Sequence, residues 1–128
     1  MNNRKLTIEK SDDGHLWGRT YEEDNLITDS ATNEEELVAQ MKQLLYDFHG
    51  IEPETVVFEV EYDLEAFFEH FDFLKITKIA EVAGINGSLM RQYATGSKYP
   101  GKKQTEKIEN AVRMLGQKMS KVSLLQSA

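Results

Sequence analysis

Apolar and polar residues alternate along the N-terminal half of the chain, which is the pattern of half-buried β-strands. Leu6 and Ile8, for example, alternate with polar neighbours on both sides. The sequence Asp-Asp-Gly at residues 12–14 follows the first such run, and Asp-Gly favours the tight turn of a β-hairpin. We therefore predict four strands, at residues 5–10, 15–21, 25–29 and 56–62.

Between the third and fourth predicted strands, apolar residues recur with the period of an α-helix, so we predict a helix there. Thr32 and Glu35 have the spacing of a capping box at its start, and Gly50 and Pro53 are stop signals at its end. The order of elements predicts a small βββαβ sheet with one helix packed across it. The apolar stripe of this helix, over residues 33–49, consists of Leu37, Val38, Met41, Leu44, Leu45 and Phe48.

From Asp63 onward the chain shows only helical periods. Asp63 can cap a first helix, and three further helices are predicted, over residues 75–83, from Asn86 and after Pro100. We therefore expect an α+β protein with one domain over residues 1–62 and an all-α domain with a C-terminal tail over residues 63–128. The phenylalanines that we expect in the core, joining the two parts, are Phe67, Phe68 and Phe71.

The charge of the chain is divided between its two parts. The whole chain of 128 residues carries a net charge of −7. Residues up to Phe71 hold five basic and 18 acidic side chains, a net charge of −13, whereas the remainder holds ten basic and four acidic ones, a net charge of +6. A basic part suits nucleic acid, and an acidic part suits a basic protein.

The absence of cysteine excludes disulfide scaffolds, cysteine nucleophiles and thiolate metal sites, and it fits a reducing cytoplasm. No apolar run approaches the ~18 residues of a membrane span, and residues 1–9 do not have the pattern of a secretory signal. We therefore expect a cytoplasmic protein without a membrane partner. His15, His49 and His70 lack the spacing of a metal site, so we expect neither a metal nor another cofactor.

Residues 76–95 have the spacing of a helix-turn-helix motif, in which two helices cross closely around a short turn. If Ile76 is position 1, a small residue falls at position 5, a glycine at 9 and apolar residues at 15 and 18. These residues are Ala80, Gly84, Met90 and Tyr93. Glycine accepts the positive φ that such a turn needs. The polar outer face of the second helix consists of Gly87, Ser88, Arg91, Gln92 and Thr95.

This segment resembles the lambda-repressor-like (XRE-type) helix-turn-helix domain over about residues 63–118. The resemblance is carried by Ile79-Ala80-Glu81, Gly84-Ile85-Asn86, Arg91-Gln92-Tyr93, Gly96-Ser97-Lys98-Tyr99-Pro100 and Lys107-Ile108. It implies a positioning helix over residues 75–83 and a recognition helix over residues 86–95.

The resemblance also implies which residues bind double-stranded DNA. The helix residues are Asn86, Gly87, Ser88, Arg91, Gln92 and Thr95, and the phosphate contacts are Ser97, Lys98, Lys102 and Lys103. The chemistry agrees, because arginine can bind guanine and glutamine can bind adenine with two hydrogen bonds each. The alternative interpretation is a solvated helix face beside a lysine-rich loop.

The N-terminal part resembles the HicB antitoxin family over about residues 4–62. The resemblance is carried by His15-Leu16-Trp17-Gly18-Arg19, Ile27-Thr28-Asp29-Ser30-Ala31-Thr32 and Glu35-Glu36-Leu37. It implies a partial RNase H-like domain that blocks a small basic HicA ribonuclease, with the C-terminal domain binding the operator of its own operon. The family's usual Pro-Gly-Cys loop is absent here. Our candidate toxin-binding residues are Trp17, Arg19, Glu22, Glu23 and Asp24, although Trp17 alternatively packs within the sheet.

We therefore predict an antitoxin and autorepressor that acts as a homodimer or higher homo-oligomer, because one helix-turn-helix reads only a short half-site. One alternative is a plain helix-turn-helix regulator whose N-terminal domain binds a small ligand or only dimerises. Another is a metal-dependent nuclease that uses Glu9, Glu59 and Glu61 on the sheet. We do not expect an enzyme, since a fold alone does not confer activity and only these three carboxylates lie on strands where they could group.

Overall fold

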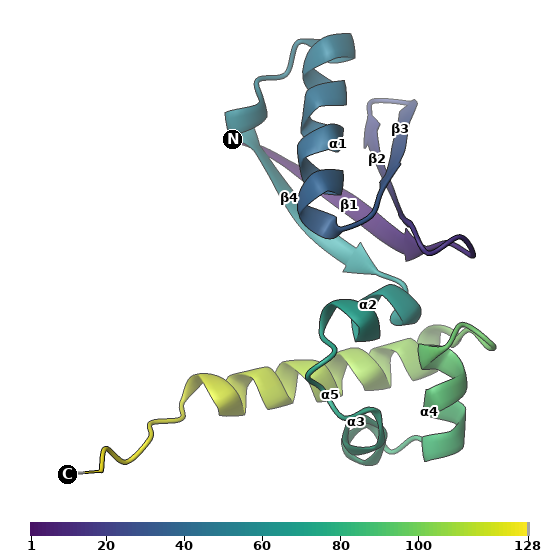
Figure 1. Cartoon of the computed structure of the whole chain (residues 1–128), viewed down its shortest axis with the longest axis vertical. Coiled ribbons are helices and arrows are strands. Elements are labelled where there is room, and N and C mark those ends of the chain that lie inside the picture. Colours follow the sequence, from purple (N-terminus) through teal and green to yellow (C-terminus); the bar gives the residue numbers. More distant parts are fainter. Residues whose placement is uncertain (128) are drawn as a thin grey trace. The chain divides into compact units, whose positions relative to one another are not determined.

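The computed structural model describes residues 1–127 of an α+β protein. Its contacts divide the chain into two compact units, Met1–His70 and Phe71–Ala128. Figure 1 shows the four strands in the first unit and the helices of the second. The charge count changes after Phe71 and the first unit ends at His70, and since Phe71 is uncharged, the division of charge coincides with the division into units.

The first unit is built on a mixed four-stranded sheet in the order β3-β2-β1-β4. Neighbouring strands β1–β2 and β2–β3 are antiparallel, whereas β1 and β4 are parallel. Parallel neighbours need a crossover connection, and helix α1 with the short 3-10 turn η1 supplies it (Figure 1). The elements are β1 (Asn2–Lys10), β2 (Leu16–Glu22), β3 (Asn25–Ala31), α1 (Glu34–His49), η1 (Pro53–Thr55) and β4 (Val56–Tyr62).

Helix α1 begins one residue later than the predicted capping box. The N-cap is Asn33, whose side chain accepts a hydrogen bond from the Glu36 backbone N–H at 2.9 Å. Thr32 instead donates to the Glu36 carboxylate at 2.7 Å. The predicted capping box of Thr32 and Glu35 was therefore wrong by one position, because asparagine is at least as good an N-cap as threonine. The helix ends as predicted at Gly50, which has a φ of 67°.

The core of the first unit lies between α1 and one face of the sheet. It contains Leu6, Ile8, Ile27, Ala31, Leu37, Met41, Leu45, Val56 and Ala66. Gly18 allows α1 to approach β2 closely, because a Cβ at this position would lie 3.0 Å from the Leu37 side chain. Phe48 does not belong to the core, and 75% of it is exposed, since the last turn of α1 extends beyond the buried stripe.

Helix α2 (Leu64–His70) belongs to the first unit, so the division falls eight residues after the expected boundary at Tyr62. The Asp63 N–H donates to the Ile8 carbonyl at 3.0 Å, and the Asp63 carboxylate accepts from the Lys10 N–H at 3.2 Å. The Lys10 ammonium also pairs with Glu69 at 2.6 Å. These contacts bind α2 to β1. Of the three predicted core phenylalanines, Phe68 is buried, whereas Phe67 and Phe71 are half-buried.

Tyr62, Glu34 and His70 connect β4, α1 and α2. The Tyr62 hydroxyl donates to the Glu34 carboxylate, and His70 Nε2 lies 3.1 Å from the same carboxylate. The Tyr62 and His70 rings are stacked, with centroids 5.6 Å apart. Burial, reinforced by Glu34, raises the pKa of Tyr62, so its phenol stays neutral and acts as a donor.

Strand β3 forms an edge of the sheet, and side chains form hydrogen bonds with part of its backbone. The Ser30 N–H donates to the Asp29 carboxylate at 2.8 Å. The Gln40 amide donates to the Ser30 carbonyl and to Asp29, both at 2.9 Å. Backbone groups that another strand would use are thus already bonded at this end of β3.

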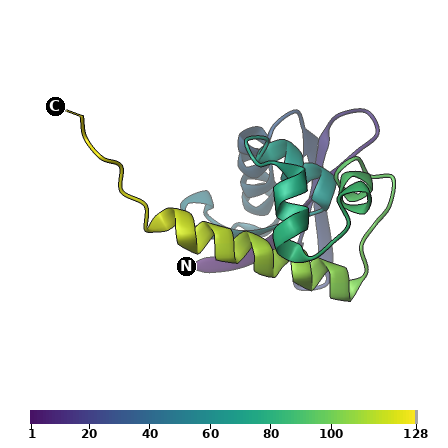
Figure 2. The same cartoon turned by 90° about the horizontal axis from the view of Figure 1, so that it is seen from below.

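The second unit contains α3 (Ile76–Ala83), α4 (Gly87–Ala94) and α5 (Lys102–Ser120), close to their predicted positions. Helix α3 packs against both α4 and α5. The C-terminal part of α5 extends past the other two helices of its unit (Figures 1 and 2). The buried residues of the unit are Ile79, Ala80, Ile85, Met90, Tyr93, Ile108 and Ala111. In residues 1–127, no helix has the combination of length and apolar character that a membrane span requires.

Candidate functional site

A tight turn joins α3 and α4 in the second unit. Gly84 has a φ of 71° at the end of α3, and its N–H bonds back to the last turn of that helix. Ala80 is 1% exposed where α3 packs against its neighbours, so a larger side chain would separate them. Ile85, which follows the turn, is buried as well. The turn therefore holds α4 in one orientation relative to α3.

Helix α4 has one buried and one exposed face. Met90 and Tyr93 are buried against the rest of the unit. The polar side chains that were predicted to read DNA are exposed, and their spacing of three and four residues places them on one face of the helix. We call this exposed set the α4 surface; it consists of Ser88, Arg91, Gln92 and Thr95.

Asn86 is the N-cap of α4 and has a structural role. Its side-chain oxygen accepts hydrogen bonds from the N–H groups of Ser88 at 2.8 Å and Leu89 at 3.3 Å. This oxygen is therefore committed to the helix start, and only the amide N–H₂ group of Asn86 is left to contact a ligand.

The α4 surface is partly organised by its own hydrogen bonds. Arg91 donates to the Ser88 hydroxyl at 3.2 Å. A Cβ added at Gly87 would lie 3.6 Å from the Arg91 guanidinium, an ordinary contact, so this arginine lies over the start of the helix. The Thr95 and Ser97 hydroxyls are hydrogen-bonded at 3.0 Å. The surface thus combines a guanidinium, an amide and hydroxyls, which are the groups that recognise base edges.

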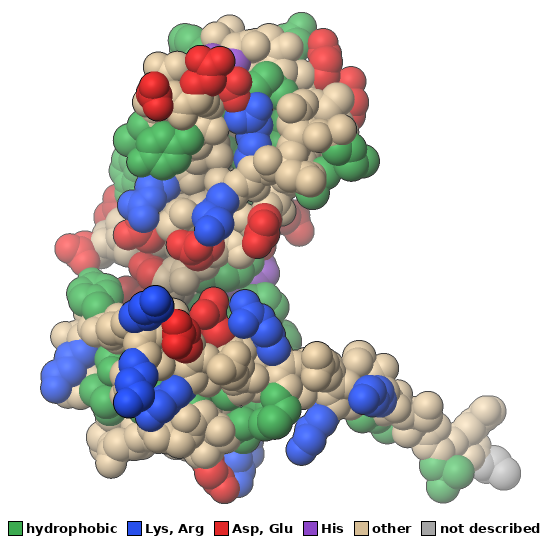
Figure 3. Space-filling model, turned by 180° about the vertical axis from the view of Figure 1, so that it is seen from behind, with side chains coloured by type: hydrophobic (Ala, Val, Ile, Leu, Met, Phe, Trp, Pro, Cys, Tyr) green, Lys and Arg blue, Asp and Glu red, His purple; other side chains and the backbone are tan. Residues whose placement is uncertain are grey.

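Three exposed lysines follow in the α4–α5 loop and at the start of α5: Lys98, Lys102 and Lys103. Among the described residues, none of the three forms an ion pair with a carboxylate. The N-cap of α5, Gly101, provides no side-chain hydrogen bond, so the first N–H groups of α5 are available to an anion. Figure 3 shows that lysine and arginine side chains are numerous on this unit. The arrangement is suited to phosphate.

The first unit presents a second candidate surface on the side of its sheet that α1 does not cover. We call this side the open face. It exposes apolar side chains, of which Trp17 is 44% and Tyr21 57% exposed. The open face also includes Leu26, which lies opposite Tyr21 in the β2–β3 register, and Val57 of β4. If Trp17 packs within the sheet, as in the alternative interpretation, much of its side chain still remains exposed to solvent.

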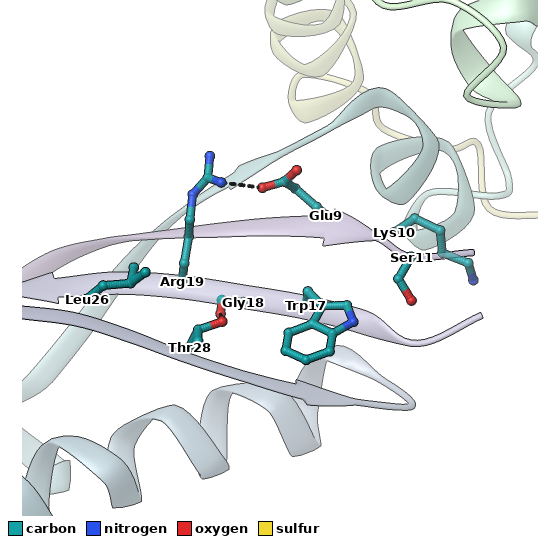
Figure 4. Close-up of a pocket in the computed structure, with 8 residues that line it drawn as sticks. All are labelled: Glu9, Lys10, Ser11, Trp17, Gly18, Arg19, Leu26 and Thr28. Atoms are coloured by element: carbon teal, nitrogen blue, oxygen red, sulfur yellow. Dashed lines mark hydrogen bonds and ion pairs between the residues drawn. The ribbon is translucent and has the colours of Figure 1, made fainter. Parts of the chain in front are cut away.

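A hollow of about 350 Å³ lies on the open face. Figure 4 shows Trp17, Leu26 and Arg19 around it, with Arg19 directed towards Glu9. The Arg19–Glu9 ion pair has a length of 2.7 Å. The other lining residues are Lys10, Ser11, Gly18 and Thr28.

The predicted toxin-binding residues do not form one cluster. Trp17 and Arg19 lie on the open face, but Glu22 alternates to the other side of β2, where it pairs with Arg4. Glu23, with a φ of 55°, and Asp24 lie in the β2–β3 turn.

Sequence reasoning missed Tyr21 and Leu26 as candidates on the open face. Their signal was present, because Tyr21 follows Trp17 and Arg19 at the strand period. Leu26 precedes the buried Ile27, so strand alternation places Leu26 on the outer side, where a polar residue is expected.

The carboxylates of the nuclease alternative are largely paired with cations. Glu9 pairs with Arg19, and Glu61 pairs with Lys5 at 3.2 Å, whereas Glu59 is exposed. Within residues 1–127, no group of three or more histidine, aspartate or glutamate side chains is arranged to hold a metal ion.

Comparisons of the chain with protein-family models, with curated proteins and with solved structures found no match. The α4 surface with its neighbouring lysines and the open face are the two candidate functional surfaces of the chain.

Proposed function

We propose that the protein is an antitoxin and autorepressor: its second unit binds double-stranded operator DNA, and its first unit binds and neutralises a small basic ribonuclease of the HicA type. The observation that carries the proposal is the polar α4 surface. It lies on a helix whose opposite face is buried, directly before three exposed lysines that form no ion pair within residues 1–127. The division of charge between the units supports two different partners.

In the DNA part of the proposal, α4 enters the major groove. Arg91 is the candidate to bind the O6 and N7 of a guanine, and Gln92 is the candidate to bind the N6 and N7 of an adenine. Lys98, Lys102 and Lys103 lie along the phosphates and fix the register of the helix on the duplex. Two copies of the chain read two half-sites about one helical turn apart.

In the protein part of the proposal, the first unit has a HicB-like, partial RNase H-like fold and covers the toxin with its open face. The βββαβ order supports this fold. Exposed aromatic residues such as Trp17 and Tyr21 are the residue types that contribute most to protein interfaces. The net charge of −13 attracts a basic partner and increases its rate of association.

The DNA assignment is tested by replacing Arg91 or Gln92 with alanine. Each substitution should cost about 1–3 kcal/mol of operator binding and relax specificity at one base position, because one pair of hydrogen bonds to a base is lost. Binding to a library of operator variants measures both effects. Gln117→Ala, an exposed glutamine on α5, is the matched control. Unchanged binding by both α4 variants would exclude α4 as the recognition helix.

The toxin assignment is tested by purifying the tagged protein from its native cell and identifying what is bound. A small basic protein in stoichiometric amount is expected. Tyr21→Ala should then reduce its recovery, whereas Tyr46→Ala, which removes a tyrosine of similar exposure (45%) from α1, should not. Equal loss in both variants would show that the open face is not the toxin surface.

A second candidate function follows from the hollow on the open face, whose volume of about 350 Å³ lies in the range of ligand pockets. In that case the protein is a helix-turn-helix regulator that responds to a small ligand. Recovery of operator DNA without any protein partner would favour this candidate, and a small molecule extracted from the purified protein would identify the ligand.

A further inference from the structure

Strand β4 forms the edge of the sheet opposite to β3, and its backbone groups point alternately towards β1 and away from it (Figure 1). The Asp63 N–H donates to the Ile8 carbonyl at 3.0 Å, and Ile8 lies opposite Tyr62 in the parallel register. Alternate residues of a strand direct their backbone groups to the same neighbour. The N–H and C=O groups of Phe58 and Val60 therefore point away from β1.

These outward backbone groups of Phe58 and Val60 form no hydrogen bond within residues 1–127. At the other edge, in contrast, side chains already bond the N–H and carbonyl groups of Ser30. The first residue of β4 is bonded as well, since the Val56 N–H donates to the Pro53 carbonyl. The middle of β4 thus presents the unpaired groups with which a strand of another molecule can form a ladder.

The side chains along this edge differ between the two sides of the sheet. On the side of α1, Phe58 and Val60 are half-buried and apolar, and α1 itself packs mainly on β2 and β3. On the open face, Glu59 and Glu61 are exposed. Glu61 pairs with Lys5, whereas Glu59 forms no ion pair within the described part of the chain. An added strand would therefore meet apolar side chains on one side and carboxylates on the other.

We propose that the β4 edge binds an extended segment of the basic toxin as a fifth strand, in which apolar residues alternate with lysine or arginine. Its apolar residues extend the row of Phe58 and Val60, and its cations lie beside Glu59, because pairs of opposite charge on neighbouring strands stabilise a sheet. The inference rests on the proposed function for the identity of the partner. It deepens that function by stating which part of the first unit the toxin pairs with and what sequence pattern does so.

Charge also decides between this partner and a second copy of the chain. Antiparallel pairing of two β4 edges about Val60 would place Glu59 of one copy opposite Glu61 of the other, and like charges at such positions destabilise a sheet. The net charge of −13 on this part of the chain opposes that pairing further, whereas it attracts a basic segment. The edge also adjoins the open face through Val57 and Glu59, so one partner can contact both.

The test uses the full chain and short labelled peptides, so it does not require the toxin. A peptide of alternating valine and lysine should bind, and one of alternating valine and glutamate should bind at least about tenfold more weakly, as measured by fluorescence anisotropy. N-methylation of alternate residues removes N–H groups from one edge of a peptide only. Methylation of the valines and methylation of the lysines should therefore weaken binding unequally.

Two variants of β4 locate the binding site. Val60→Pro removes an outward N–H group and leaves the ladder with β1 intact, because proline is tolerated where its nitrogen faces solvent. It should weaken binding of the basic peptide at least about tenfold, and thermal unfolding shows whether it is folded. Glu59→Lys leaves the backbone unchanged and should also weaken binding, so the site is tested even if the proline variant does not fold. Glu35→Lys, the same charge change on α1, is the control.

Three results would overturn the inference: equal affinity for the basic and acidic peptides, equal effects of the two methylations, or equal effects of Glu59→Lys and Glu35→Lys. Recovery of the toxin separates this inference from the proposed function. A toxin recovered equally by the wild type, Val60→Pro and Glu59→Lys would refute the edge and leave the toxin assignment standing. Peptide binding at the edge without any basic protein from the native cell would refute the toxin assignment and leave the edge as a site for basic strands.

Discussion

Glu65, on α2, shows how neighbouring charges act on a single residue. Burial, together with the nearby Asp63 carboxylate, raises the pKa of Glu65, and Lys10 opposes this effect only in part. A carboxyl with a raised pKa holds its proton more tightly in the folded state than in the unfolded state. The contribution of Glu65 to stability therefore becomes less favourable as the pH rises through the range between the two pKa values.

We accordingly expect Glu65→Gln to raise the melting temperature at neutral pH. The gain should disappear below about pH 4, where glutamate is protonated in both states. Thermal unfolding of both proteins across this pH range provides the measurement. Glu35→Gln is the control, because Glu35 is an exposed carboxylate in the first turn of α1. A melting temperature that Glu65→Gln lowers at neutral pH would contradict the expected sign.

At the scale of elements, the sequence pattern predicted the four strands and five α-helices but not the short 3-10 helix η1, because the strands and α-helices bury regular apolar stripes and η1 does not. The pattern did not show which of two neighbouring polar residues caps a helix. Thr32 and Asn33 can both cap α1, and only the geometry of the chain selects Asn33. Helix α2 was assigned to the second part of the chain, whereas it belongs to the first unit, since its attachment depends on hydrogen bonds between Asp63 and the distant residues Ile8 and Lys10.

The two candidate sites were also predictable to different extents, because periodicity places residues of one element but not residues of separate elements relative to one another. The α4 surface lies within one helix, so spacing alone places its side chains on one face. The open face combines residues from separate strands, and its composition depends on the register between them. Glu22 was grouped with Trp17 by proximity in sequence, although strand alternation places the two on opposite sides of β2.

The start of α4 allows the structural role of Asn86 to be separated from a role in binding. Asn86→Ala should lower the free energy of unfolding by about 1 kcal/mol, because two N–H groups lose their acceptor. Asn86→Asp should retain the cap and the stability but weaken DNA binding, since the carboxylate repels phosphate. Chemical denaturation and DNA titration of both variants test this. A loss of stability in Asn86→Asp as large as in Asn86→Ala would exclude the capping role.

At the scale of the whole molecule, net charge is a poor guide to what the protein binds. The chain is acidic overall, with a charge of −7, yet its second unit alone carries +6. Exposed charges interact over about 10 Å at ordinary ionic strength, so each unit presents mainly its own charge to a partner. A predominantly acidic protein is thus compatible with binding to a polyanion.

The salt dependence of operator binding should therefore depend only on the charges of the second unit. Affinity should fall linearly with salt on logarithmic axes, and Lys102→Ala or Lys103→Ala should reduce the slope by about 1, because one fewer counterion is released. Lys5→Ala removes the same charge from the first unit and should leave the slope unchanged. Identical slopes for all of these variants would exclude phosphate contacts at the start of α5.

The hydrogen bonds that Gln40 makes across β3 have a consequence for the protein before it meets any partner. A bare strand edge is a template for fibril growth, since each added strand exposes the same edge again. At Ser30 the template is blocked, because Asp29 and Gln40 already satisfy its backbone. Under the proposed function, the free protein has to remain available to its toxin. A blocked edge would help it to stay in solution without aggregating, while the open face remains accessible.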